Sequence, residues 1–300
     1  MNCIKLNKLT SNAQAILWVT ASVGFFSLVF ASGKFAGNIA SPLQILFLRY
    51  IGGMLTLLII SLIGGYKIKN HRSRYSHLHF YRVFCGAFGG VAIIYSSANM
   101  PIVDATAIGL LDTVFLVLIG VFFLYERIAI RHWGAIGVCF AGAVVIMLSK
   151  DVFREMNMDY WWPALCALLG ALLIALESVM IKRFTQSERR MTILLYANRY
   201  GILLLGLPAV MSWGSLDILH NLTFLLLGPI AIAAQYMTLR GYQLADLSVV
   251  GPVNYSWLIF AAIIGFVGFG EVPTQGTMIG AMLIVLGGIL LLMIKPQNMK

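Results

Sequence analysis

The sequence predicts an all-α integral membrane protein, with ten transmembrane helices arranged as two inverted five-helix repeats around a central cavity. Three observations support this fold class. Of the 300 residues, 60% are hydrophobic and only 11% are charged, whereas about 25% of an average soluble protein is charged. Apolar runs of about 20 residues, the length that crosses a hydrocarbon core, recur along almost the whole chain. The two halves of the chain also resemble each other in sequence.

The apolar runs predict ten membrane spans joined by short connections. No connection is long enough for a soluble domain, and the chain contains no GxxxxGK[ST] phosphate-binding loop, so the sequence offers no motif for ATP-driven pumping. The predicted limits of the spans are 13–33, 42–63, 79–99, 102–124, 131–149, 160–182, 190–212, 220–241, 247–269 and 274–294.

Lysine and arginine residues predict the orientation of these spans. If the N-terminus lies inside, the connections on the outer side hold only Lys34, Lys150 and Arg154, and most other basic residues fall on the inner side. Cytoplasmic loops are enriched in lysine and arginine. We therefore expect a multi-pass protein of the cell (inner) membrane with both termini in the cytoplasm. The same distribution explains the net charge of +10, and nucleic acid is not expected as a partner.

An internal repeat links the fourth and ninth spans. The segment YSSANMPIVDATAIGLLDTVFLVLIGVFFLYERI, which starts at Tyr95, resembles RGYQLADLSVVGPVNYSWLIFAAIIGFVGFGEVP, which starts at Arg240. In this alignment Glu126 lies opposite Glu271, each just after the fourth apolar run of its half. The match in order, as well as in hydropathy, indicates a duplicated unit.

An Arg-Tyr pair extends the repeat to the second and seventh spans. It occurs at Arg49 in FLRYIGGMLTLLI and at Arg199 in ANRYGILLLGLPA. Residues 1–150 and 151–300 are therefore predicted to be two copies of one five-span unit. Because five is odd, the copies face opposite ways across the membrane. Inverted repeats are typical of transporters whose binding site lies near the midplane between the halves.

Short motifs carry a resemblance to a known group: LRYIGG, ANMPIVDATAI and YERI in the first half, and NRYG, LADLSVVGPV and GEVP in the second. From about Trp18 to Met293 the chain resembles the drug/metabolite transporter superfamily, specifically its ten-span EamA branch. The resemblance implies a secondary carrier rather than an enzyme, with no cofactor, that moves a small organic metabolite. It also implies that spans 1–4 and 6–9 enclose the cavity. Asp112, Asn254 and Tyr255 depart from the residues commoner in this branch, which leaves the substrate open.

Asp112 is the most informative single residue of the fourth span. A rise of about 1.5 Å per residue from Ile102 places it roughly 15 Å deep, near the midplane. A charge at that depth costs at least about 2.5 to 3.5 kcal/mol, so it requires a wet cavity, a partner or a proton. We expect Asp112 to face the cavity and to recognise an ammonium group or to couple transport to protons. The alternative is a structural carboxyl bonded to a neighbouring helix.

The remaining charges of the spans are expected to be structural or to act in gating. Arg49 and Arg199 are expected to share a structural role, although a guanidinium also suits a carboxylate or phosphate of a substrate. Glu177 is predicted to lie within reach of Arg199 as a neutralised ion pair. Glu126 and Glu271 are the matching acids of the repeat.

Aromatic and amide side chains are expected to line the cavity, because such a mixture suits an organic metabolite with planar and polar parts. Tryptophan and tyrosine near span ends also form interfacial belts, which is the alternative for each of them. The residues predicted to contact substrate, besides Asp112, are Trp18, Tyr95, Asn99, Gln235, Tyr236, Asn254, Tyr255 and Trp257.

One carboxylate with aromatic side chains suits an amino acid or an amino-acid-derived compound such as S-adenosylmethionine. A vitamin such as riboflavin, or a nucleobase, would use the aromatic and amide groups without the charge. An integral membrane lipid enzyme is disfavoured, because His132 and His220 stand alone and no cluster has the spacing of metal ligands. A channel is disfavoured because no span repeats polar residues along one stripe. Gly276 and Gly280 form a GxxxG motif, which suggests a homodimer through spans 5 and 10.

Overall fold

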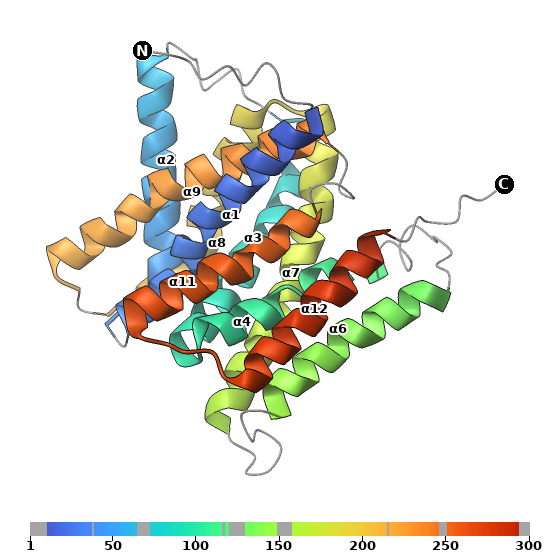
Figure 1. Ribbon diagram of the computed structural model, residues 1–300. Helices are drawn as coiled ribbons and strands as arrows, with labels where there is room; N and C mark the ends of the chain where they lie inside the picture. Colours follow the sequence, from blue (N-terminus) through green and yellow to red (C-terminus); the bar gives the residue numbers. More distant parts are fainter. Residues whose placement is uncertain are drawn as a thin grey trace, which may run out of the picture.

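The computed structural model describes residues 11–37, 39–64, 73–115, 118–119, 130–148, 158–214, 216–245 and 251–293. Within this part of the chain all regular structure is helical (Figure 1). The elements are α1 (Ser11–Ala36), α2 (Pro42–Ile63), α3 (Ser76–Asn99), α4 (Ile102–Gly109), α6 (Ile130–Leu148), α7 (Met158–Ser187), α8 (Arg190–Met211), α9 (Ile218–Leu244), the 3-10 helix η3 (Gly251–Ser256), α11 (Trp257–Phe269) and α12 (Gln275–Met293).

Six of the described helices are long and apolar enough to cross a bilayer: α1, α2, α3, α7, α8 and α9. Shorter apolar stretches lie in α6, in the η3–α11 segment and in α12. Large apolar side chains such as Leu62, Leu207 and Val267 are exposed on the outside of the bundle, which suits contact with lipid rather than water. Ten spans stay a prediction, because length and composition identify six of them here.

The fourth predicted span is interrupted. The helix α4 ends at Gly109, Leu110 and Leu111 form a turn, and a new helical turn begins at Asp112. The expectation of one continuous helix over 102–124 was therefore wrong. Gly109 gives a physical reason, since glycine is among the weakest helix formers.

The ninth predicted span is also interrupted. Its described part starts with the 3-10 helix η3 and becomes α-helical at Trp257, so residues 251–269 are not the single α-helix expected there, and residues 247–250 lie outside the described residues. Pro252 lies within η3 and has no backbone N–H to donate. In the sequence alignment of the halves Trp257 stands opposite Asp112, so both interruptions end at the same aligned position.

The helices pack in pairs that bring the two halves of the chain together. α6 runs along α12, α3 along α7, and α1 along α9, while α2 contacts both α8 and α9 (Figure 1). Gly52 of α2 meets Gly228 of α9, and Gly142 of α6 meets Gly280 of α12, so closely that a Cβ atom on either glycine would strike the partner backbone. Gly280 therefore packs within the chain. The homodimer through spans 5 and 10 stays a prediction without this glycine as its support.

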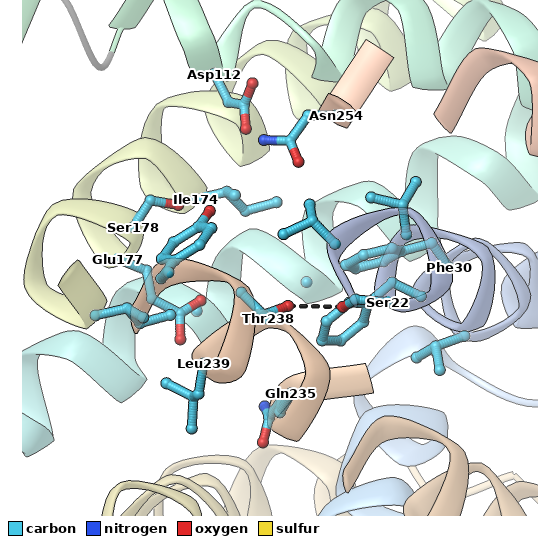
Figure 2. A pocket seen from close by; sticks show the side chains of 18 of the residues that line it. Ser22, Phe30, Asp112, Ile174, Glu177, Ser178, Gln235, Thr238, Leu239 and Asn254 are labelled. Atoms are coloured by element: carbon cyan, nitrogen blue, oxygen red, sulfur yellow. Dashed lines mark hydrogen bonds between the residues drawn. The ribbon is translucent and has the colours of Figure 1, made fainter. Parts of the chain in front are cut away.

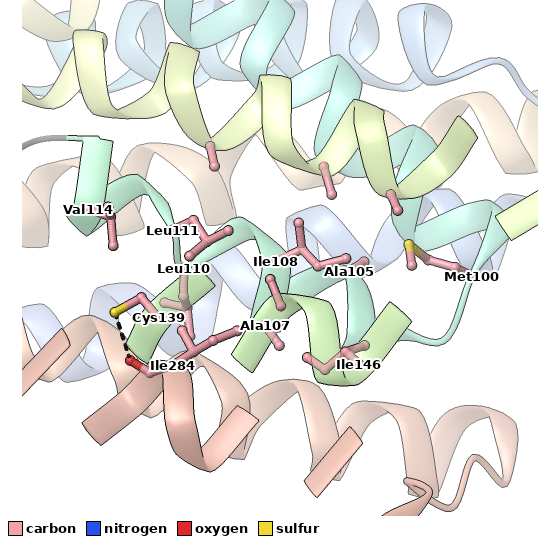
Figure 3. Close-up of a cluster of buried hydrophobic side chains, with 14 of the residues drawn as sticks. Met100, Ala105, Ala107, Ile108, Leu110, Leu111, Val114, Cys139, Ile146 and Ile284 are labelled. Carbon is pink, nitrogen blue, oxygen red and sulfur yellow. Dashed lines mark hydrogen bonds between the residues drawn. The ribbon is translucent and has the colours of Figure 1, made fainter. Parts of the chain in front are cut away.

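The largest buried apolar cluster surrounds the fourth span. Ala105, Ile108 and Leu111 pack against Ile146 of α6 and Ile284 of α12, and α7 closes the other side (Figure 3). Cys139 adds a hydrogen bond from its Sγ to the Ile284 carbonyl at 3.6 Å. This cluster fixes the position of α4, and with it the place where the span is interrupted.

Candidate functional site

A central cavity of about 160 Å³ lies where α1, α2, α3, α7, α8 and α9 meet the two interrupted spans. Three lining residues come from these spans: Asp112 directly follows the turn after α4, Asn254 lies in η3, and Trp257 is the first residue of α11. In Figure 2 the amide of Asn254 points toward the carboxylate of Asp112. The interruptions therefore deliver an acid, an amide and an aromatic ring to the same space.

Asp112 is partly buried and faces the cavity. The hydroxyl of Thr113 donates a hydrogen bond to its Oδ1 at 3.1 Å. No lysine, arginine or histidine of the described residues forms an ion pair with it. The carboxylate is thus placed as the depth argument expects, without a cation of the protein, and its role in binding stays a prediction.

A second acid of the cavity is neutralised by the protein itself. Nε of Arg82 in α3 lies 3.3 Å from Oε1 of Glu177 in α7, and Nη1 of Arg82 donates to the Ile193 carbonyl at 3.5 Å. Gly86 leaves room for the Glu177 carboxylate, which a Cβ atom there would strike. The predicted pair of Glu177 with Arg199 is wrong, because Arg199 is exposed on α8 and α3 supplies the partner instead.

Arg49 also lines the cavity and is only 5% exposed. Its guanidinium lies over the ring of Tyr50, with 3.9 Å from Cζ to the ring centroid. Its Nε has no hydrogen-bond partner, and no carboxylate of the described residues pairs with it. Arg199 is exposed, so the two arginines lie in different environments, and their shared structural role stays a prediction.

Three of the predicted aromatic and amide residues line the cavity, namely Gln235, Asn254 and Trp257. Trp257 packs against Phe30 of α1 with ring centroids 5.0 Å apart. The Oε1 atom of Gln235 is buried without a hydrogen-bond partner. These groups offer a ligand one aromatic face and one amide oxygen without a hydrogen-bond partner.

Trp18 and Tyr236 do not line the cavity. Their rings meet edge to face at 6.5 Å, and the guanidinium of Arg190 lies over the Tyr236 ring. Each is the direct neighbour of a lining residue, Val19 or Gln235. Successive helical residues point about 100° apart, and here the rotation of each helix directs Val19 and Gln235 into the cavity and turns Trp18 and Tyr236 away from it.

Tyr95, Asn99 and Tyr255 lie elsewhere too, so their prediction as cavity residues is wrong. Asn99 is exposed at the end of α3 and donates a hydrogen bond to the Tyr95 carbonyl at 2.8 Å. Tyr255 is buried in the apolar cluster around α4, one position after Asn254. Of these two adjacent residues of η3, both predicted to contact substrate, only Asn254 lines the cavity.

Sequence reasoning missed the wall that α1 and α9 form. Ser22 donates to the Ala234 carbonyl at 2.8 Å, and its hydroxyl lies 2.6 Å from that of Thr238 (Figure 2). The lining residues of α1 recur at helical spacing, which was the available signal. They are Val19, Ser22, Val23, Phe26, Val29 and Phe30.

Comparison with known proteins now decides the family. The sequence model of the EamA-like transporter family matches residues 13–148 and again 161–293. The chain belongs to the EamA-like transporter family. Its characterised relatives are transporters rather than enzymes, and this chain is a multi-pass membrane transporter of a small metabolite.

The named relatives carry different molecules. The chain is 25% identical over 280 residues to an S-adenosylmethionine uptake transporter of Rickettsia bellii, covering 90% of this chain and 93% of that one. It is 30% identical over 220 residues to a riboflavin transporter of Rhizobium johnstonii, with 71% and 69% covered. A pseudopaline exporter of Pseudomonas aeruginosa is 27% identical over 275 residues, with 89% and 91% covered.

A solved crystal structure shares the fold. It superposes with a TM-score of 0.62 over 91% of this chain and 96% of that one, at 18% identity.

One end of this EamA-like transporter is held by an ion pair between Lys34 of α1 and Glu271, which follows α11. Lys34 also donates to the Met100 carbonyl at 3.2 Å, and Glu271 accepts from the backbone N–H of Ile102 at 3.0 Å. Glu271 thus caps the start of α4, and Lys34 holds the end of α3. Glu126, the counterpart of Glu271 in the first half, lies outside the described residues.

The opposite end of the transporter, near the start of α1, has a related lysine. Nζ of Lys182 in α7 donates to the carbonyls of Tyr242 at 3.1 Å and Ala245 at 3.4 Å. Ser11 binds the neighbouring Leu244 carbonyl at 2.7 Å. Lys182 therefore holds the end of α9 as Lys34 holds the end of α3.

The transporter contains a second acid in its fourth span that the sequence reading missed. Asp104 is fully buried and accepts hydrogen bonds from the hydroxyls of Tyr160 at 3.0 Å and Thr277 at 2.8 Å. It links α4 to α7 and α12 away from the cavity. No sequence pattern marks it, since its partners come from distant parts of the chain.

Proposed function

We propose that this chain is a secondary carrier that moves an amino acid or an amino-acid-derived compound, such as S-adenosylmethionine, across the cell membrane by alternating access. The observation that carries the proposal is the central cavity at which both interrupted spans present polar groups, with Asp112 forming no ion pair with a basic side chain of the described residues. Interrupted helices at the substrate site are a feature of carriers with inverted repeats. Asp112 binds the ammonium group of the substrate; proton transport by the same carboxyl is the alternative.

The proposed inverted repeat has support at the two ends of the bundle. Lys34 and Lys182 each lie 21 residues after the first residue of their matched segment, at residue 13 or 161. Each donates to the carbonyl of the residue that caps the next-but-one helix, Met100 after α3 or Ala245 after α9. Equivalent residues making equivalent bonds at opposite ends are what two oppositely oriented copies, residues 1–150 and 151–300, would produce.

Alternating access then follows from contacts that break at one end at a time. With both termini in the cytoplasm, the pair formed by Lys34 and Glu271 lies on the outer side and closes the cavity there. The two side chains are only 22% and 16% exposed, so opening on this side requires the pair to separate and both groups to regain water. The cavity of about 160 Å³ is smaller than the roughly 300 Å³ at which sites for drug-sized ligands begin. A nucleoside-sized ligand therefore requires a wider state.

A vitamin or nucleobase such as riboflavin is the second candidate. It is favoured by the Phe30–Trp257 pair in the cavity wall and by the riboflavin transporter among the relatives. A planar ring system would stack on these aromatic faces. It would leave the charge of Asp112 without a function in binding.

Counterflow in proteoliposomes tests the proposal. Vesicles preloaded with unlabelled L-methionine, S-adenosylmethionine or riboflavin receive the labelled compound outside, and we expect trans-stimulated uptake of the amino-acid compounds. A channel would show no trans-stimulation. Exchange of riboflavin alone would replace the proposed substrate with the second candidate.

A further inference from the structure

The cavity wall contains four ionisable charges, and only two of them neutralise each other. Arg82 and Glu177 form an ion pair at 3.3 Å. Arg49 and Asp112 form no direct ion pair among the described residues, although Glu177 is near enough to Arg49 to interact with its charge. The cavity wall therefore carries two basic and two acidic groups, of which Arg49 and Asp112 are not directly bonded to a group of opposite charge.

The neighbours of Arg49 fix its guanidinium in an orientation suited to binding a ligand. The Tyr50 ring covers one face of the guanidinium, with 3.9 Å from Cζ to the ring centroid, a favourable cation–π arrangement, and Nε is left without a hydrogen-bond partner. Tyr50 is itself only 4% exposed. Gly201 of α8 makes room for its ring, because a Cβ atom at this position would strike it.

Burial of a guanidinium whose Nε makes no hydrogen bond destabilises the protein unless a ligand accepts that bond. A carboxylate matches it best, since two parallel N–H···O bonds can form between the planar groups. Asp112, at the interruption of the fourth span, is suited to an ammonium group in the same way. A ligand with one carboxylate and one ammonium group would compensate both charges and leave the cavity neutral.

We propose that Arg49 binds the carboxylate of the substrate and that Arg49 together with Asp112 selects zwitterions. This inference rests on the proposed function and adds a specificity-determining residue to it. Dianionic phosphate esters would leave Asp112 facing a like charge, and polyamines would do the same to Arg49. Neutral flavins and nucleobases would leave both charges uncompensated.

The test compares three probes that differ at one group each: L-methionine, its methyl ester, which lacks the carboxylate, and 4-methylthiobutanoate, which lacks the ammonium group. Binding to purified protein and counterflow are measured for the wild type, Arg49→Met and Arg49→Lys. We expect the wild type to prefer L-methionine to the ester by about tenfold or more, as the loss of charge-assisted hydrogen bonds implies. Arg49→Met should reduce this ratio to near one, and Arg49→Lys should restore part of it.

The ratio of two probes on one variant does not depend on the folded fraction, so reduced stability of Arg49→Met cannot imitate the effect. An unchanged ratio in Arg49→Met overturns the role of Arg49 while leaving the carrier intact. Absence of exchange of L-methionine and S-adenosylmethionine by the folded wild type overturns the proposed function and this inference together. Arg199→Met, a change at the exposed arginine of the second half, is the matched control and should keep the wild-type ratio.

Discussion

Asp104 and Asp112 are two acids of one predicted span with opposite surroundings. Asp104 is sealed among α4, α7 and α12 and accepts hydrogen bonds from two hydroxyls. Asp112 stands at the interruption, lines the cavity and accepts a bond from Thr113 alone among the side-chain contacts described. The comparison shows that depth in the membrane does not assign a role to a carboxyl. The number of protein groups that bond the carboxyl is more informative, because a carboxyl whose hydrogen bonds are already made has little left to offer a ligand.

The largest expected effect is the loss of stability in Asp104→Leu. The change leaves the buried hydroxyls of Tyr160 and Thr277 without their acceptor, and each such group costs about 1 to 3 kcal/mol. The melting temperature in detergent, measured by size-exclusion chromatography after heating, should fall sharply. Tyr160→Phe removes the tyrosine hydroxyl and keeps that of Thr277, and it should give a smaller fall. A Leu variant as stable as the wild type would contradict the structural role.

Asp112→Asn should reduce transport and leave stability nearly unchanged. We expect counterflow to fall by about tenfold or more, since a neutral amide cannot compensate an ammonium group, while the melting temperature changes little. Asp217→Asn is the matched control, because Asp217 is an exposed cap of α9 and asparagine caps helices equally well. Normal transport and normal pH dependence in Asp112→Asn would remove the acid from the mechanism.

The smallest effect is expected for Thr113→Val, which removes the hydroxyl that binds Asp112 at 3.1 Å and keeps the shape of the side chain. One neutral hydrogen bond is worth about 1 kcal/mol, so the apparent affinity in uptake assays should change by less than about tenfold. The melting temperature should remain closer to the wild type than in Tyr160→Phe. A larger loss of stability than of affinity would place Thr113 with the structural group around Asp104.

Much of the architecture was available from the sequence because hydropathy and family motifs act along the chain. The apolar runs located the helices, the family prediction was confirmed, and the depth of Asp112 pointed to the cavity. Pro252 predicts the break in the ninth span, and Gly109 could also have predicted that in the fourth, because both residues weaken a helix locally.

What the sequence did not supply were the contacts between distant helices. Glu177 pairs with Arg82 of α3 rather than with Arg199, and Asp104 is satisfied by α7 and α12. Among adjacent residues, Gln235 faces the cavity and Tyr236 does not. Each outcome depends on the rotation of a helix about its axis, which composition alone does not determine.

The contact between α6 and α12 has a mechanical consequence. At Gly142, Gly280 and Gly287 nothing but hydrogen separates one helix from atoms of the other, so the two cannot slide without a steric collision. We expect α6 and α12 to move together as one rigid unit during the transport cycle, while the elements that surround the cavity bend.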